Sequence, residues 1–184
     1  MNLTGLKINK TWTLFLDRDG VINKRITGDY VKTWDQFEFL PGVLEAIKIF
    51  SGIFGRILVV SNQQGIGKKV MTEKSLVEIH EKMIGIINAE HGRIDKIYYS
   101  PHLEKEGSFL RKPNIGMMLK ARKDFPGIRM TKSIMAGDSL SDMIFGHRSD
   151  MMTVFISNDI DLIRRGHKII DFTYPDLITF AKEL

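Results

Sequence analysis

The sequence predicts an α/β protein in which helices cover both faces of a parallel sheet. Short apolar or β-branched runs alternate with helix-like patterns along the chain, which is the order of elements in βαβ units. Polar and acidic residues come directly after several of these runs, at the edge where open α/β sheets bind ligands. The chain has 184 residues, enough for one domain with a sizeable core. We therefore expect a single three-layer α/β/α domain over residues 1–184, Rossmann-like and without a large cap domain.

The elements of the first half follow from periodicity and capping signals. The apolar run 14–16 predicts a buried strand, and the β-branched run 56–60 predicts a second one. Residues 21–40 lack clear periodicity, so we expect a loop or small flap over the tip of the first strand. A helical pattern starts after Pro41, and Thr72 is the expected N-cap of a long helix that reaches about residue 90.

Strands and helices continue to alternate in the second half. Strands are expected at 94–99, 133–136 and 151–156, with a short sixth at 169–172. Helices are expected after Pro113, from Ser139, for one turn after an N-cap at Asn158, and over 176–182. In a parallel sheet the carboxyl ends of all these strands lie at one edge.

Composition narrows the classes of function. The chain contains no cysteine, which excludes disulfides and thiolate metal sites. Its formal charge of +5 suits an anionic substrate. The basic residues are scattered along the chain, so we expect no nucleic-acid partner. Aliphatic runs such as 57–60 are far too short to span a bilayer, and residues 1–10 do not resemble a signal peptide. We expect a cytoplasmic enzyme or binding domain without a membrane partner.

Four polar sets fall at or just beyond the ends of predicted strands. Asp17 and Asp19 follow the first strand, Ser61 the second, Lys112 lies in a loop after the third, and Asp138 follows the fourth. Taken alone, the acidic pair fits an ordinary Asp-Gly turn equally well. Together the four sets predict one crevice at the carboxyl edge of the sheet.

This inventory fits phosphoryl transfer. Asp17 and Asp138 supply the oxygen ligands that Mg²⁺ prefers, while Ser61 and Lys112 suit phosphate oxygens. Asp17 would attack phosphorus as a nucleophile and form an aspartyl-phosphate. Asp19 would protonate the leaving oxygen and then accept a proton from water.

The chain resembles the haloacid dehalogenase superfamily of aspartate-nucleophile phosphatases. The motifs that carry the resemblance occur in the family's order over about residues 12–145: 16–21 (LDRDGV), 60–63 (VSNQ), 111–113 (RKP) and 137–143 (GDSLSDM). Within the superfamily it is most similar to the compact branch of heptose 1,7-bisphosphate and histidinol-phosphate phosphatases. The phrases at 17–23 (DRDGVIN), 37–39 (FEF) and 61–66 (SNQQGI) carry that closer likeness.

The resemblance implies roles for matched positions. Asp17 is the expected nucleophile and Asp19 the acid/base, and the Mg²⁺ site is made by Asp17, Asp19 (through its backbone carbonyl) and Asp138. Ser61 and Lys112 hold the transferring phosphate. Three further residues are expected to face the substrate beyond the phosphate: Asn62, Gln63 and Arg111.

This chain departs from that branch in the loop before the RKP motif. In other members of the branch this loop often carries a Cys/His zinc site. Only His102 remains in this sequence, and a single histidine does not make a structural zinc site. We therefore expect no zinc and a loop held by packing alone.

Several assignments stay open at the level of sequence. Asp142 fits both a residue behind the metal ligands and the acidic partner of a capping box with Ser139. Arg25 and Tyr30 in the flap either contact the substrate or only pack the flap. Lys68, like the lysine after it, is read mainly as a solvated surface charge.

The expected function is Mg²⁺-dependent hydrolysis of a small phosphorylated metabolite, a sugar (bis)phosphate such as heptose 1,7-bisphosphate. Histidinol-phosphate phosphatase and polynucleotide 3′-phosphatase are the alternatives on the same fold. A phospho-accepting receiver domain uses a similar set of residues, but its phosphoacceptor follows a later strand, and Ser61 stands where that strand ends.

Overall fold

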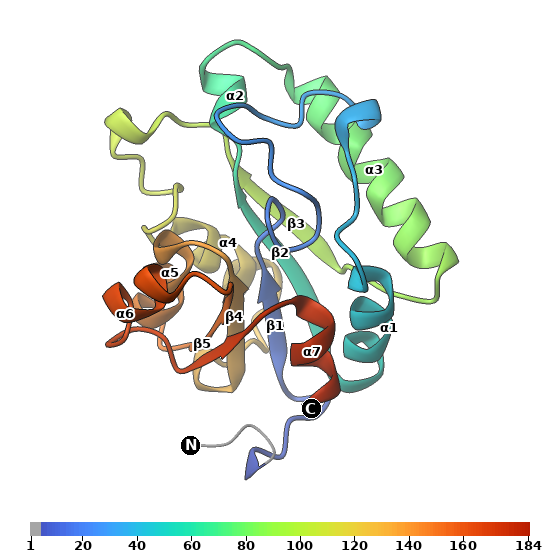
Figure 1. Cartoon of the computed structure of the whole chain (residues 1–184), viewed down its shortest axis with the longest axis vertical. Coiled ribbons are helices and arrows are strands. Elements are labelled where there is room, and N and C mark those ends of the chain that lie inside the picture. Colours follow the sequence, from blue (N-terminus) through green and yellow to red (C-terminus); the bar gives the residue numbers. More distant parts are fainter. Residues whose placement is uncertain (1–4) are drawn as a thin grey trace.

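The sheet of this protein is fully parallel and has six strands (Figure 1). The computed structural model describes residues 5–184. The strands are β1 (Thr13–Leu16), β2 (Arg56–Asn62), β3 (Lys96–Ser100), β4 (Ser133–Gly137), β5 (Met152–Ile156) and β6 (Phe172–Tyr174). They lie in the order β3-β2-β1-β4-β5-β6. Because β1 pairs with β2 on one side and β4 on the other, the chain order reverses at β1, and ligands bind at such switch points.

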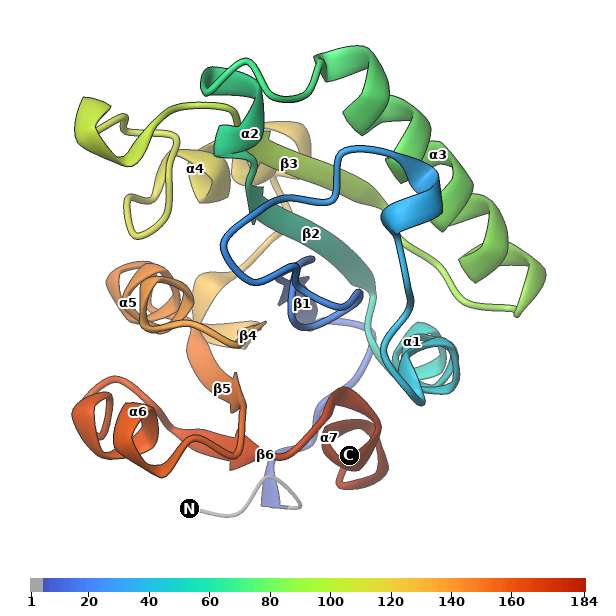
Figure 2. The same ribbon diagram turned by 45° about the horizontal axis from the view of Figure 1, so that its top comes forward.

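Helices lie on both sides of this sheet (Figure 2). They are α1 (Val43–Ile53), α2 (Gln64–Gly67), α3 (Glu73–Ala89), α4 (Gly116–Asp124), α5 (Leu140–Arg148), α6 (Ile160–Arg165) and α7 (Leu177–Lys182). Four of them begin at a side chain that accepts a backbone N–H of the first turn, as good N-caps do; these caps are Thr72, Ser139, Asp159 and Asp176. None of the helices within residues 5–184 combines the length and the hydropathy needed to cross a bilayer.

The alternation of side chains along the strands builds two cores. Leu14 and Leu16 point to the face covered by α1, α3 and α7, where they pack with residues such as Phe50 and Phe180. Phe15 points to the opposite face and packs with side chains of α4 and α5. Burial on both faces explains why β1 reads as a continuous apolar run. The predicted α/β/α architecture is confirmed.

Most strands differ from their predicted bounds by one or two residues, as β3 does by beginning at Lys96, and three differences have a local explanation. The sixth strand begins at Phe172 because Asp171 is tied to β5 instead: its carboxylate accepts a hydrogen bond of 2.8 Å from the backbone N–H of Thr153. The N-cap of α6 is Asp159, which accepts from the N–H of Leu162 at 2.9 Å, one residue after the expected position. The single turn α2 was not predicted, because its two glycines are typical of a loop.

Residues 21–40 form the flap expected over the tip of β1 (Figure 2). An isolated bridge between Asn23 and Phe39 closes the base of the flap. Trp34 and Phe37 stack with ring centroids 4.9 Å apart and pack against the main core. The flap therefore stands on an apolar base while its polar tip faces the carboxyl edge of the sheet.

Candidate active site

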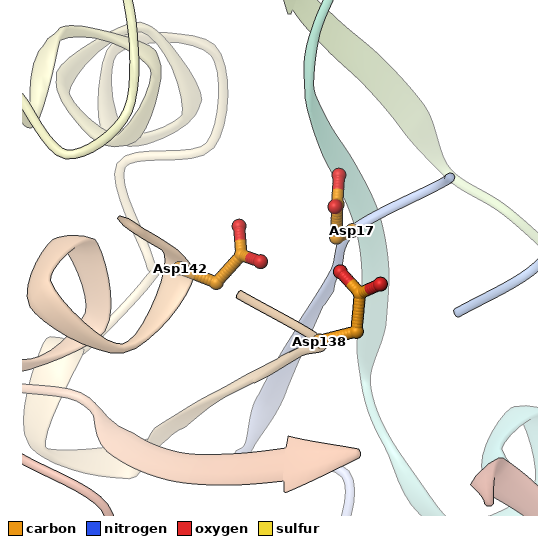
Figure 3. A group of neighbouring side chains, drawn as sticks. All are labelled: Asp17, Asp138 and Asp142. Atoms are coloured by element: carbon orange, nitrogen blue, oxygen red, sulfur yellow. The ribbon is translucent and has the colours of Figure 1, made fainter. Parts of the chain in front are cut away.

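Three carboxylates converge at the carboxyl edge of the sheet (Figure 3). Asp17 directly follows β1, Asp138 directly follows β4, and Asp142 lies in the first turn of α5. One carboxylate oxygen from each lies within 4.8 Å of the others. Asp17 and Asp142 are buried, so the three charges repel one another where water screens them little.

A buried lysine offsets part of this negative charge. The Nζ of Lys112 lies 2.8 Å from Oδ1 of Asp17 and 2.6 Å from Oδ1 of Asp142, and it donates a hydrogen bond to the Val60 carbonyl. Burial alone would lower the pKa of Lys112, but the carboxylates of Asp142 and Asp17 outweigh burial and raise this pKa. Lys112 therefore stays charged and ties the ends of three elements together.

Asn62 fixes the loop that carries this lysine. Its Oδ1 accepts the backbone N–H of Lys112 at 3.0 Å, and its Nδ2 donates to the carbonyl of the same residue at 3.0 Å. The side chain of Asn62 thus pairs with the Lys112 backbone as a neighbouring strand would. It also lines the site cavity, so its expected contact with the substrate remains a prediction.

Crowding raises the pKa of two carboxyl groups. Burial, followed by the charge of Asp142, raises the pKa of Asp17 to about 6 in spite of Lys112. Burial and the charges of Asp17 and Asp142 raise the pKa of Asp138 to about 8. Both shifts mean that the three carboxyl groups favour a bound proton or cation over the state in which all of them are ionised.

Arg25 reaches this cluster from the flap. Its Nη2 lies 2.7 Å from Oδ1 of Asp138 and donates to the backbone carbonyl of Asp19 at 3.0 Å. Burial would lower the pKa of Arg25, but the charges of Asp138 and its neighbours raise it. The guanidinium contacts the carboxylate and the carbonyl that were expected to bind metal.

The carboxylate of Asp19 points into a separate hydrogen-bond network. Arg18 donates to both of its oxygens at 2.8 and 2.9 Å, Asn23 donates to Oδ1 at 3.0 Å, and Gln63 donates to Oδ2 at 2.7 Å. Burial would raise the pKa of Asp19, but Arg18, Asn23 and Gln63 together lower it below its ordinary 3.8. Asp19 is therefore ionised and fixed at both oxygens, and only its backbone carbonyl faces the carboxylate cluster.

Gln63 was expected to face the substrate, and the structure places it elsewhere. It is buried, and besides Asp19 its Nε2 donates to Oγ of Ser61 at 2.8 Å. Its side chain therefore links the expected proton shuttle to the expected phosphate-binding hydroxyl. Arg111 lines the cavity, as expected, and its Nη1 donates to the His102 carbonyl at 3.4 Å.

A cavity of about 430 Å³ lies over these groups, within the range of small-molecule sites. Its floor holds Asp17, Ser61 and Lys112, and its walls include Tyr30 and Lys68. Lys68 was read mainly as a solvated surface charge; it lines the cavity, with its Nζ 5.2 Å from the centre of the Tyr30 ring. The cavity is thus lined by buried carboxylates with one buried lysine and by exposed charged residues of both signs.

The oxygen atoms around Asp17 fit a magnesium ion. The candidate donors are carboxylate oxygens of Asp17 and Asp138 and the carbonyl of Asp19, all of the hard oxygen type that Mg²⁺ prefers. The raised pKa values of Asp17 and Asp138 and the attraction of Arg25 both show that this position favours positive charge. Asp142 faces Lys112 and forms the predicted capping box with Ser139, accepting from its N–H at 3.1 Å.

Two features of the site were not predicted from sequence. The ion pair of Arg25 with Asp138 joins residues 113 positions apart, and an aperiodic flap gives no signal of such a contact. The contact between Arg18 and His80, 62 positions apart, was likewise missed. His80 lies beside the apolar face of α3, a position that predicts a packed or partly exposed side chain and gives no sign of its partner.

Comparison with known proteins places this site in a wider context. The family model described as polynucleotide kinase 3 phosphatase matches residues 13–182. The D-glycero-α-D-manno-heptose-1,7-bisphosphate 7-phosphatase of Mycobacterium bovis is 40% identical over 136 residues, which are 74% of this chain and 72% of that protein. The D-glycero-β-D-manno-heptose-1,7-bisphosphate 7-phosphatase of Haemophilus influenzae is 31% identical over 178 residues, which are 93% of this chain and 95% of that protein.

A solved structure is similar over nearly the whole chain. It is the D,D-heptose 1,7-bisphosphate phosphatase from B. bronchiseptica complexed with magnesium and phosphate. It matches with a TM-score of 0.84 at 25% identity and covers 94% of this chain and 97% of its own. Sequence and fold thus agree on the same group of proteins.

Proposed function

The chain belongs to the polynucleotide kinase 3 phosphatase family of haloacid dehalogenase-type phosphatases, and on that premise we propose that it removes the 7-phosphate of a heptose 1,7-bisphosphate with Mg²⁺. It is a phosphoric monoester hydrolase. The observation that carries the proposal is the pairing of buried Asp17 with the buried cation of Lys112 beside a second carboxylate, Asp138, at the switch point of the sheet. Relatives named for both anomers of this sugar bisphosphate, one covering 93% of the chain, support the substrate class.

The first step in this proposal is attack by Asp17 on phosphorus. Lys112 holds one carboxylate oxygen of Asp17, and we assign the attack to the other oxygen. A new bond forms between this oxygen and phosphorus while the bond from phosphorus to the sugar oxygen breaks. Asp19 would deliver a proton to the departing sugar oxygen, which makes it a better leaving group.

The second step returns the enzyme to its starting state. Water attacks the phosphorus of the aspartyl-phosphate, Asp19 accepts a proton from this water, and the bond to Asp17 breaks to release phosphate. The network around Asp19 holds it ionised, which suits the role of a base in this step. For the first step Asp19 must carry a proton, which the approach of the dianionic ester favours because like charge raises the pKa of a carboxyl group.

The remaining groups of the site bind and orient the phosphate. The hydroxyl of Ser61 and the ammonium of Lys112 lie at the cavity floor, where they would hold phosphate oxygens. Asp17, Asp138 and the Asp19 carbonyl would hold Mg²⁺, which would supply positive charge that offsets the repulsion between carboxylate and phosphate. Arg111 and Lys68 on the rim provide positive charge for the anionic remainder of the substrate.

A substrate panel tests this proposal. The purified chain is incubated with heptose 1,7-bisphosphate of each anomer, histidinol phosphate and a 3′-phosphorylated oligonucleotide, with Mg²⁺ or with a chelator. We expect the highest kcat/KM for a heptose bisphosphate and release of phosphate only with the metal. A preference for the oligonucleotide, or hydrolysis that persists under chelation, would contradict the proposal.

A further inference from the structure

Arg18 is a charged side chain that is fully buried beside the site. It stands between Asp17 and Asp19 in sequence, yet its exposed fraction is 0%. Its Nη2 donates to both oxygens of Asp19 and lies 3.4 Å from Oε1 of Gln63. An arginine has donors only, so the position of its guanidinium depends on the acceptors around it.

His80 supplies the acceptor on the other side of this guanidinium. It lies on α3, is 7% exposed, and its Nε2 is 3.1 Å from Nη1 of Arg18. Because Arg18 can only donate, Nε2 must accept, and the ring proton is assigned to Nδ1. Burial and the charge of Arg18 lower the pKa of His80 to about 3, which keeps the ring neutral and able to accept.

Successive hydrogen bonds connect helix α3 to the candidate active site. His80 accepts a hydrogen bond from Nη1 of Arg18, and Nη2 of the same buried guanidinium donates to both carboxylate oxygens of Asp19. The Nε of Arg18 is buried and has no hydrogen-bond partner among residues 5–184. With Nε unpaired, Asp19 and Gln63 hold one side of the guanidinium and His80 alone holds the other.

We propose that His80 is a positioning residue that fixes the carboxylate of Asp19 through the guanidinium of Arg18. The inference deepens the proposed function and rests on it, because Asp19 matters only if it transfers protons. Loss of His80 would leave the positive charge of Arg18 beside Asp19 but free the guanidinium to turn. The positive charge next to Asp19 is then retained, but the carboxylate of Asp19 is no longer held in one orientation. Proton transfer depends steeply on that orientation.

The experiment compares two substrates that differ in their need for an acid. An alkyl ester, heptose 1,7-bisphosphate, releases a basic alkoxide and needs a proton from Asp19. An aryl ester, p-nitrophenyl phosphate, releases a weakly basic phenolate and needs little help. The kcat/KM of each ester depends on the steps up to cleavage of its phosphorus–oxygen bond. Comparing the two values therefore isolates the need for a proton from Asp19.

The variants separate positioning from packing. His80→Leu removes the acceptor, and His80→Gln restores an acceptor at similar reach. Ile79→Val is the control, because Ile79 is the fully buried neighbour of His80 on α3 and offers no hydrogen bond through its side chain. Thermal unfolding midpoints of all variants show which of them remain folded at the assay temperature.

We expect His80→Leu to lower kcat/KM about tenfold or more for the heptose ester and less than about threefold for the aryl ester. His80→Gln should recover most of the loss, and Ile79→Val should leave the ratio of the two esters unchanged. An equal fall for both esters, or no rescue by glutamine, would overturn the inference alone. Failure of the wild type to hydrolyse either ester with Mg²⁺ would overturn the proposed function and this inference with it.

Discussion

The guanidinium of Arg25 and the carboxylate of Asp138 form an ion pair of 2.7 Å that joins the flap to the residue after β4. The same guanidinium nitrogen contacts the carbonyl of Asp19. Both oxygens belong to the proposed magnesium site, so a metal ion and Arg25 compete for them. Because Arg25 belongs to the flap, metal binding at these oxygens would change the contacts of that flap.

Arg25→Gln should therefore strengthen the binding of Mg²⁺. The Arg25 side chain is 50% exposed, and an exposed pair contributes about 0.5–1 kcal/mol, so the dissociation constant should fall about two- to fivefold. Isothermal titration with MgCl₂ in the absence of substrate measures this change. Arg93→Gln, which breaks a pair with Asp95 away from the site, should leave the affinity unaltered; weaker binding in Arg25→Gln would refute the competition.

Asp17→Asn should abolish turnover while preserving the fold. An amide is a far weaker nucleophile than a carboxylate, so we expect a loss of at least about 10³-fold in kcat. Release of phosphate from heptose 1,7-bisphosphate is the measurement, and circular dichroism verifies the fold. Asp35→Asn, on the exposed part of the flap, should retain activity. Substantial turnover by Asp17→Asn would mean that another group attacks phosphorus.

The metal-free protein should lose stability as pH rises from 5 to 8. The folded pKa of Asp138 is raised to about 8 from an ordinary 3.8, so the folded state binds more protons than the unfolded state between these values. The free energy of unfolding therefore falls as pH rises through this window, on the order of 4 kcal/mol from this group. Asp17, with a pKa of about 6, acts in the same direction over the lower part of the window.

Urea unfolding with a chelator at pH 5 and pH 8 measures this loss. Asp138→Asn should flatten the pH dependence, whereas Asp161→Asn, whose side chain is 88% exposed, should not. Added Mg²⁺ should restore stability more at pH 8 than at pH 5, since it takes the place of the lost protons. A wild type whose stability rises from pH 5 to 8 without metal would contradict the pKa shifts.

Lys112→Met should destabilise the fold because it leaves Asp17 and Asp142 without their shared cation. Breaking one side of a buried ion pair costs about 3–5 kcal/mol. The double variant Lys112→Met/Asp142→Asn should recover part of this loss by removing one of the stranded charges. Urea unfolding at pH 8 measures both variants. Lys82→Met, which loses a surface pair with Glu78 and a contact with the Trp34 ring, serves as control. Equal stability of the single and double variants would show that Asp142 does not bear the unpaired charge.

The sheet and the floor of the site could be predicted from sequence because both depend on local patterns. The run 14–16 is apolar on both faces, and Asp17, Ser61 and Asp138 follow strands that must share an edge once the strands are parallel. Their convergence required no knowledge of side-chain packing. The capping box of Ser139 and Asp142 is equally local, and the structure confirms it.

The contacts that could not be predicted all depend on tertiary packing. Gln63 follows Ser61 by two residues, yet it turns inward because Asp19 offers a buried acceptor within reach. Arg18 is hidden between two aspartates, and nothing in its neighbours indicates that a helix 62 residues later supplies an acceptor. Arg25 lies in a segment without periodicity, where sequence gives no orientation.

The central place of β1 has a consequence for how this enzyme can change. Asp17 is attached to a strand with hydrogen-bonded neighbours on both sides, so amide exchange should be slowest there and fastest at the tip of the flap. The proposed nucleophile and the flap residues that line the cavity should therefore differ in local stability. New specificities can arise by altering residues 24–33 while the element that carries the chemistry stays untouched.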